Sequence, residues 1–131
     1  TARLLGHEPE VETCLVEMSW GEWEGRSFPE LRQVCAKELE VQRARGLDFR
    51  PTGGESPRDV QERLSPWLMA LATPTLAVCH KGVIQAVYSL ATGWNMIDKP
   101  AEKPRANTAH LFHVKAGVPM VERMNIPLEA E

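Results

Sequence analysis

The clearest pattern of apolar and polar positions predicts a helix that begins near residue 56. Five apolar residues fall on one helical face, at i, i+4, i+7, i+8 and i+11: Val60, Leu64, Trp67, Leu68 and Leu71. Ser56 suits the N-cap, Pro57 suits the first turn, and Asp59 places a carboxylate near the helix start. Pro66 predicts a kink or bend in this helix, because proline disturbs a helix interior.

A short apolar run, Thr75–Cys79, follows without polar alternation, which is typical of a strand covered on both faces in a parallel sheet. A helical pattern over residues 82–92 begins directly afterwards and ends at Gly93. His80 therefore lies where a buried strand would end and a helix would start. Ligands bind at the carboxyl ends of strands in open α/β sheets, and helix N-termini offer free N–H groups to anions. His80 is thus a candidate for phosphate chemistry.

Weaker patterns predict the remaining elements. Residues 29–45 show an apolar stripe at helical spacing, and Gly46 suits the position just past the end of that helix. Residues 11–15 alternate weakly, as in a short strand. Residues 109–112 and 118–124 favour two strands joined at Ala116-Gly117. Strands that alternate with helices imply a layered α/β fold.

Composition bounds the class of protein. A chain of 131 residues suits one domain, which we place at residues 1–131. The net charge of −3 argues against general nucleic-acid binding, which needs a basic face. No apolar stretch is long enough to span a membrane, and the N-terminus has no signal-peptide pattern. Three irregularly spaced cysteines indicate no disulfide framework, so we expect a cytoplasmic protein.

Two further segments carry recognisable motifs. Residues 15–25 contain Leu-x-Glu followed by Gly-Glu-Trp-Glu-Gly, and residues 53–60 contain Gly-Glu-Ser at a helix start. Together with the apolar run that leads into His-x-Gly, these motifs resemble the histidine phosphatase superfamily, the group of the phosphoglycerate mutases and their phosphatase relatives. The resemblance runs from Thr1 to about Val114. It implies a three-layer α/β sandwich with a mostly parallel sheet and helices on both faces.

The resemblance also implies a mechanism. In that family a histidine in an Arg-His-Gly motif attacks phosphorus, a carboxylic acid protonates the leaving group, and a second histidine stabilises the transferring charge. Matching this pattern, Glu17 would be the acid and His80 the second histidine, while Lys81 could add a phosphate-binding charge. Catalysis would need no metal and no cofactor, and the substrate would be a small phosphorylated metabolite. Residues 17–25 are most similar to α-ribazole phosphatase-like members.

The chain also departs from the family pattern. No Arg-His-Gly occurs in it, and Cys79-His80-Lys81-Gly82 stands where the family has Ser-His-Gly-Gly. Thr1-Ala2 resemble a pair that lies further along the family domain. We therefore expect a partial domain without its first strand, first helix and nucleophile, inactive by itself. The alternative is a non-catalytic remnant that binds phosphate ligands or a partner protein. An exposed sheet edge would favour association, including with a second copy of the chain.

Each candidate residue has a competing structural interpretation. Glu17 could be a solvated loop carboxylate and His80 a hydrogen-bonded strand-end histidine, although the motif order favours the site roles. Trp20 and Trp23 are large aromatic residues, so packing is the favoured interpretation over lining a pocket. Glu55 fits structural support for the Ser56 helix start better than catalysis.

Three other positions are interpreted as structural. His110 and His113 are three residues apart on a predicted strand and would face opposite sides, which argues against a shared metal. Cys79 is interpreted as a small core residue rather than a catalytic thiol. Asn107 matches an asparagine that the family often carries before a strand, and turn chemistry explains it equally well.

Overall fold

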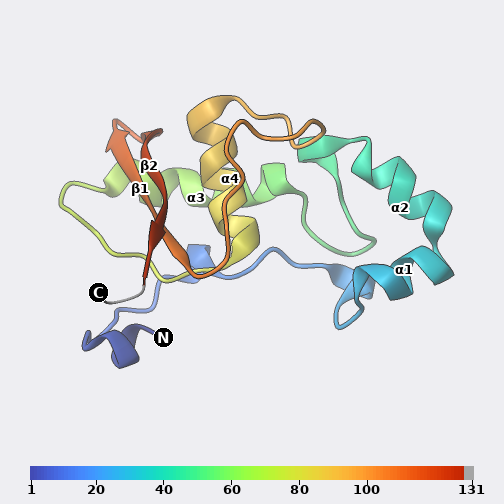
Figure 1. The fold of residues 1–131 in the computed structure, drawn as a ribbon, viewed down its shortest axis with the longest axis horizontal. Helices are drawn as coiled ribbons and strands as arrows, with labels where there is room; N and C mark the ends of the chain where they lie inside the picture. The colour runs from blue at the N-terminus through green and yellow to red at the C-terminus, as the bar shows by residue number, and fades with distance from the viewer. Residues whose placement is uncertain (129–131) are drawn as a thin grey trace.

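The computed structural model describes residues 1–128, so residues 129–131 of the predicted domain lie outside the described part. The molecule is elongated, with two short helices at one end, a hairpin at the other, and two longer helices between and behind them (Figure 1). In chain order, the helices and strands are α1 (Phe28–Val34), α2 (Ala36–Arg43), α3 (Pro57–Ala70), α4 (Lys81–Thr92), β1 (Thr108–Lys115) and β2 (Val118–Pro127). Short 3-10 turns over Ala2–Leu5, Thr13–Leu15, Gly21–Trp23 and Gly46–Asp48 interrupt the loops.

The sequence predicted one continuous helix over residues 29–45. This prediction is wrong, because the structure has two helices, α1 and α2. The backbone leaves helical geometry at Cys35, with φ −142° and ψ 46°, and this residue separates α1 from α2. Each helix buries one leucine, Leu31 in α1 and Leu39 in α2. Val34, which the helical pattern places on the apolar face, is 69% exposed. The bend therefore lets two short helices each present one leucine to the core.

The prediction for α3 is confirmed at its start and on its buried face. The Ser56 hydroxyl accepts a hydrogen bond from the Asp59 N–H at 3.1 Å, and the Asp59 carboxylate accepts one from the Ser56 N–H at 2.7 Å. This reciprocal capping satisfies two donors that a helix start would otherwise leave free. Three members of the predicted apolar face are almost fully buried: Val60, Leu64 and Leu68. They fix α3 against the rest of the core.

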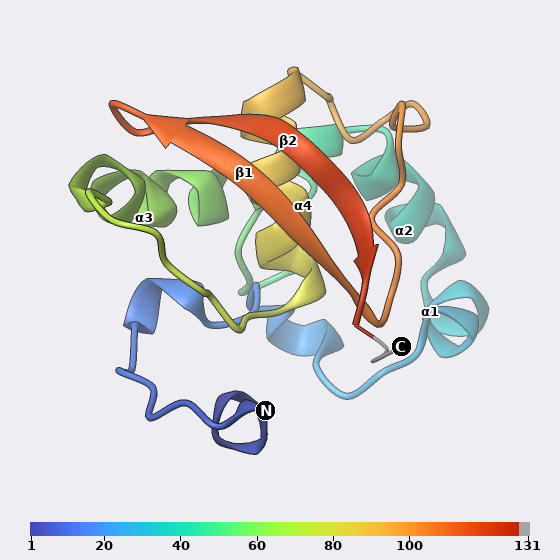
Figure 2. The same ribbon diagram turned by 60° about the vertical axis from the view of Figure 1, so that its left-hand side comes forward.

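The predicted boundaries of α4 are also confirmed. The helix begins at Lys81, directly after His80, and ends at Gly93, whose φ of 74° is the left-handed conformation that glycine adopts easily. Val83 and Ala86 are fully buried in the core that α4 shares with α3. The hairpin lies across α4, with β2 in contact with the helix (Figure 2). α4 is thus covered on more than one side.

The strands β1 and β2 form the predicted antiparallel hairpin. Lys115 pairs with Val118 at its closed end, and the two residues between them are Ala116 and Gly117. Both have positive φ, 49° and 77°. Two positive φ values are the signature of the type I′ turn, whose twist matches that of the flanking strands. The turn therefore sets the register of the hairpin.

Two predicted strands are absent from the described residues. Thr75–Cys79 forms no strand, and its side chains are largely exposed, with Leu76 66% exposed. A strand needs a hydrogen-bonded neighbour, and this segment has none among residues 1–128. Over residues 11–15 the chain makes a short 3-10 turn instead, because the Glu12 carboxylate accepts a hydrogen bond from the Cys14 N–H at 3.3 Å.

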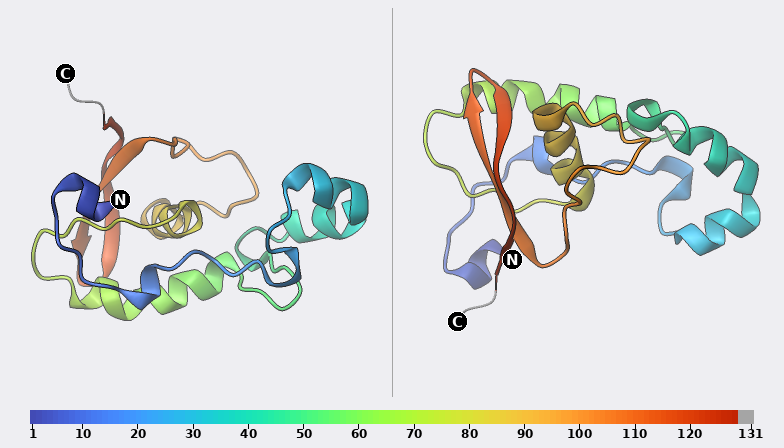
Figure 3. Two further views of the ribbon diagram at one scale, coloured as in Figure 1. Left: turned by 90° about the horizontal axis from the view of Figure 1, so that it is seen from below. Right: turned by 45° about the horizontal axis from the view of Figure 1, so that its top comes forward.

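The mixture of helices and sheet expected from the sequence is confirmed. The sheet of the described residues has two antiparallel strands, β1 and β2, and no parallel pair. Seen from below, α1 and α2 lie apart from the hairpin (Figure 3). The three-layer sandwich stays a prediction. Among residues 1–128, no helix combines the length and the apolar character needed to cross a membrane.

Candidate functional site

The structure brings Glu17 to the start of α4, next to His80. The Glu17 Oε2 atom accepts a hydrogen bond from the Gly82 N–H at 3.2 Å, and its Oε1 atom accepts one from the Met18 N–H at 2.8 Å. The first N–H groups of a helix have no partner within the helix, so Gly82 offers a free donor. A carboxylate also suits the positive end of the helix dipole. Glu17 thus contacts the first turn of the helix whose N-cap is His80, 63 positions further along the chain.

Gly82 makes this approach possible. A Cβ atom at position 82 would overlap Glu17 Oε1 and would lie 3.5 Å from the Cβ of Met18. Only glycine leaves room for the carboxylate against the backbone of α4. Sequence reasoning used Gly82 only as part of the His-x-Gly motif. The signal that could have identified it is a glycine in the first turn of a helix, where alanine has the higher propensity.

His80 is the N-cap residue of α4, with extended φ of −123° and ψ of 164°. Its backbone carbonyl accepts the first hydrogen bond of the helix, from the Ile84 N–H at 3.0 Å. The imidazole does not cap the helix, and it is exposed, as is Lys81. Both side chains are therefore accessible to an anion that approaches the helix start. Their roles in binding or catalysis stay predictions.

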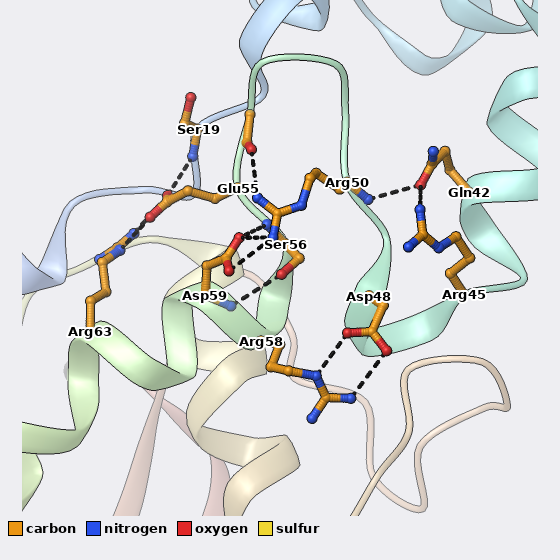
Figure 4. Close-up of polar contacts among 11 residues, drawn as sticks. Ser19, Gln42, Arg45, Asp48, Arg50, Glu55, Ser56, Arg58, Asp59 and Arg63 are labelled. Carbon is orange, nitrogen blue, oxygen red and sulfur yellow. Dashed lines mark hydrogen bonds and ion pairs between the residues drawn. The ribbon is translucent and has the colours of Figure 1, made fainter.

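Glu55 is structural, as the sequence suggested, but it supports the loop that carries Glu17 rather than the Ser56 helix start. Its Oε2 atom accepts a hydrogen bond from the Ser19 N–H at 2.9 Å, and its Oε1 atom accepts one from the Arg63 Nε at 2.9 Å (Figure 4). The resulting ion pair is mostly covered, with side-chain exposures of 28% for Glu55 and 21% for Arg63. Sequence reasoning did not identify Arg63, because nothing in the helical pattern distinguishes it from a solvated arginine.

Trp20 and Trp23 pack as the sequence favoured. Trp23 is buried, and its ring lies 5.9 Å from that of Phe49 in an edge-on arrangement. The ring of Trp20 lies 5.6 Å from Phe49 and 5.7 Å from Phe28. Such edge-to-face pairs add stability beyond the area they bury. The aromatic cluster joins the loop before α1 to the core.

Burial disfavours an activated thiol at Cys14 and at Cys79. Burial, together with a hydrogen bond to Glu12, raises the pKa of Cys14 to about 11. Burial also raises the pKa of Cys79, which packs against the core. A raised pKa disfavours the thiolate, the reactive form of cysteine. This agrees with the interpretation of Cys79 as a core residue.

His110 and Asn107 have structural features that account for them. The Nδ1 atom of His110 accepts a hydrogen bond from the Asn125 N–H at 3.1 Å, and burial lowers the pKa of His110. Asn107 has φ of 57°, a conformation that asparagine tolerates in turns. Among residues 1–128 no group of three or more histidine, cysteine, aspartate or glutamate side chains could hold a metal ion.

Comparison with known proteins identifies the family. A profile of the histidine phosphatase superfamily (branch 1) matches residues 1–127, and the chain belongs to this superfamily. Similar proteins include a probable fructose-2,6-bisphosphatase of Schizosaccharomyces pombe, 24% identical over 132 residues that cover 99% of this chain and 32% of the relative. The fructose-2,6-bisphosphatase of Saccharomyces cerevisiae is 25% identical over 92% of this chain and 29% of the relative.

A third relative is the 6-phosphofructo-2-kinase/fructose-2,6-bisphosphatase of Arabidopsis thaliana, which is 29% identical over 93 residues. That match covers 68% of this chain and 12% of the relative. The chain therefore spans about a third or less of the length of these curated relatives.

Proposed function

We propose that Glu17, His80 and Lys81 form the acid and charge-stabilising part of a phosphoryl-transfer site in a phosphomonoester hydrolase, within a single domain over residues 1–131. The observation that supports the proposal is the hydrogen bond between the Glu17 carboxylate and the Gly82 N–H, in the first turn of the helix that follows His80. Membership of the histidine phosphatase superfamily supports it.

The proposed chemistry follows from the charges at the start of α4. Phosphoryl transfer depends mainly on positioning and on stabilising the charge of the transferring group. The exposed imidazole of His80 and the ammonium of Lys81 supply donors and positive charge beside the helix N-terminus. The like charge of a phosphoryl group favours the protonated form of a neighbouring carboxyl. Glu17 would then protonate the leaving oxygen, a step that contributes about 10²–10⁴-fold in enzymes.

The nucleophile of this reaction would be a histidine in an Arg-His-Gly motif, through a phosphohistidine intermediate, and residues 1–131 contain no such motif. We therefore propose that the chain by itself binds phosphate but does not turn over. The substrate class is a small phosphorylated metabolite. The names of the relatives make a sugar phosphate such as fructose 2,6-bisphosphate the first compound to test in a protein that carries the nucleophile.

The test is a titration of the ¹⁵N-labelled chain with inorganic phosphate, followed by NMR. We expect saturable shifts of the Lys81 and Gly82 amide signals, reduced in His80→Ala and Lys81→Ala. Lys115→Ala removes an exposed lysine on the hairpin and should bind as the wild type does. The absence of saturable shifts in the wild type would contradict the site.

A second assay tests whether the chain turns over by itself, and the lack of Arg-His-Gly leaves the non-catalytic phosphate-binding protein as the alternative. The chain should hydrolyse an aryl phosphate at a negligible rate. Robust turnover that His80→Ala abolishes would overturn this expectation. The coding sequence before Thr1 is the discriminating observation, because an in-frame Arg-His-Gly there would supply the nucleophile, and a chain extended by that segment should then turn over.

A further inference from the structure

Arg63 makes an unusual set of contacts with the segment that carries Glu17. It lies on α3, yet its guanidinium donates to the backbone carbonyls of Cys14 and Val16, the latter at 2.7 Å. The same group donates to both carboxylate oxygens of Glu55, at 2.9 and 3.3 Å. One side chain thus binds two carbonyls that are 49 and 47 residues away in the chain.

Glu55 completes the contact on the other side of Glu17. Its carboxylate accepts from the Ser19 N–H at 2.9 Å, and its own backbone N–H donates to the Ser19 carbonyl at 2.9 Å. Figure 4 shows Glu55 between Ser19 and Arg63, with its carboxylate pointing to both. The backbone is therefore held at Cys14, Val16 and Ser19, on both sides of residue 17.

This support matters because residues 16–20 belong to no helix or strand. A loop without regular hydrogen bonds leaves its backbone groups in need of other partners, and its position is not fixed by a ladder. Here a guanidinium satisfies the carbonyls before Glu17 and a carboxylate satisfies the amide after it. The ion pair is also better covered than the surface pair of Arg58 with Asp48, in which the side chains are 50% and 51% exposed.

We propose that Arg63 and Glu55 are positioning residues that clamp the Glu17 loop, so that the Glu17 carboxylate stays at the start of α4. An effect of the clamp on catalysis rests on the proposed role of Glu17. The clamp itself rests only on the contacts of Arg63 and Glu55 with the loop. Lysine cannot replace Arg63, because the four contacts need the planar fork of a guanidinium with several fixed N–H directions. A catalytic group that loses such support becomes misplaced, and small displacements cost large rate factors.

The test uses the Gly82 amide as a reporter of the Glu17 carboxylate. In the wild type the hydrogen bond to Glu17 should protect this amide from hydrogen exchange, and Glu17→Ala should remove that protection. We expect Arg63→Lys and Glu55→Gln to speed hydrogen exchange of the Gly82 amide about fivefold, the loss of one net hydrogen bond. Arg58→Lys is the matched control, since Arg58 lies on the same helix and pairs with the exposed Asp48.

The outcomes are distinguishable. A Gly82 exchange rate in Arg63→Lys equal to that in Arg58→Lys would overturn the clamp. A uniform rise in exchange across the amides of α3 and α4 would also overturn it, because Arg63 would then support only the fold. If the clamp variants alter Gly82 but the wild type shows no saturable phosphate binding, the proposed function fails and the clamp stands. In a chain with turnover, Arg63→Lys should lower kcat with little change in KM.

Discussion

The carboxylate of Glu17 and the backbone of Gly82 are 65 residues apart in the chain and meet at the start of α4, where Glu17 Oε2 accepts the Gly82 N–H at 3.2 Å. The contact needs an acid on the loop and a residue without a side chain on the helix. It also places the acid beside His80, the N-cap of the same helix. This pair connects the two sequence motifs that suggested a phosphoryl-transfer site.

Gly82→Ala should displace Glu17 without unfolding the protein. The added Cβ would overlap Oε1, which lies at the free end of a flexible side chain and can swing away. Alanine also has a helix propensity better by up to about 1 kcal/mol. We expect the free energy of unfolding in urea to stay within about 1 kcal/mol of the wild-type value, while the amide of residue 82 loses its protection from hydrogen exchange.

A double-mutant cycle checks the cause. In a Glu17→Ala background the overlap is gone, so Gly82→Ala should be more favourable there than in the wild type. An identical effect of Gly82→Ala in both backgrounds would mean that the two residues are not coupled.

Ser56→Ala should lower the free energy of unfolding by about 1 kcal/mol, the usual cost of removing an N-cap. Ser56 is 2% exposed, and its hydroxyl caps the helix that carries the best-buried face of the protein. Ser27→Ala removes the same type of capping box from the short, exposed helix α1 and should cost less. Urea denaturation measures the free energy of unfolding of both variants. Equal decreases in the two variants would contradict the expectation that the cap of α3 contributes more than the cap of α1.

Stability should depend on His110 near neutral pH. Burial lowers the pKa of His110 from its ordinary value of 6.5, an effect that the charge of Glu102 opposes. The unfolded chain therefore takes up this proton at a higher pH than the folded chain does. The stability that neutral His110 contributes is complete above about pH 6.5. It is lost as the pH falls from there through the pKa of His110 in the folded protein. Thermal unfolding at two pH values on either side of 6.5 measures it.

His110→Gln should flatten the dependence of stability on pH, whereas His7→Gln, a change of an exposed histidine, should leave it as in the wild type. A wild-type dependence in His110→Gln would rule out this histidine as its cause.

Carboxyl groups affect stability at lower pH. The pKa of Asp59 is lowered by its hydrogen bonds with Ser56 and by Arg50, so the stability that Asp59 contributes is lost only as the pH falls below about 4.

Ala116→Asn should stabilise the hairpin. Ala116 has φ of 49°, and a left-handed conformation costs an ordinary L-residue about 1–2 kcal/mol, whereas asparagine tolerates it. The variant would have Asn-Gly, the preferred pair for a type I′ turn. Gly117→Ala is the opposite control, because φ is 77° and the new Cβ would lie 3.1 Å from the Met69 sulfur. We expect the melting temperature to rise in the first variant and to fall in the second.

Much of the fold could be predicted where local chemistry decides it. The Ser56 capping box, the Gly93 helix end and the Ala116-Gly117 turn all depend on residues within a few positions of one another. The break at Cys35 could not be predicted, because no proline or glycine marks it and the bend serves the burial of Leu31 and Leu39.

The candidate site likewise has parts that could be predicted from the sequence and parts that could not. Glu17 and His80 could be nominated as candidates from the order of the motifs. The contacts of Glu17 with Gly82, and of Arg63 with two distant carbonyls, have no signature in the sequence. They depend on which loop packs against which helix.

The sequence by itself determined the start of α3, both ends of α4 and the hairpin turn, because caps and turns are set by hydrogen bonds between near neighbours in the chain. It also determined the superfamily, through motifs that keep their order. Only the tertiary structure decided that Thr75–Cys79 forms no strand, since a strand exists only with a neighbouring chain segment. The tertiary structure also decided that Glu17 meets Gly82 beside His80, because that contact depends on packing across 65 residues.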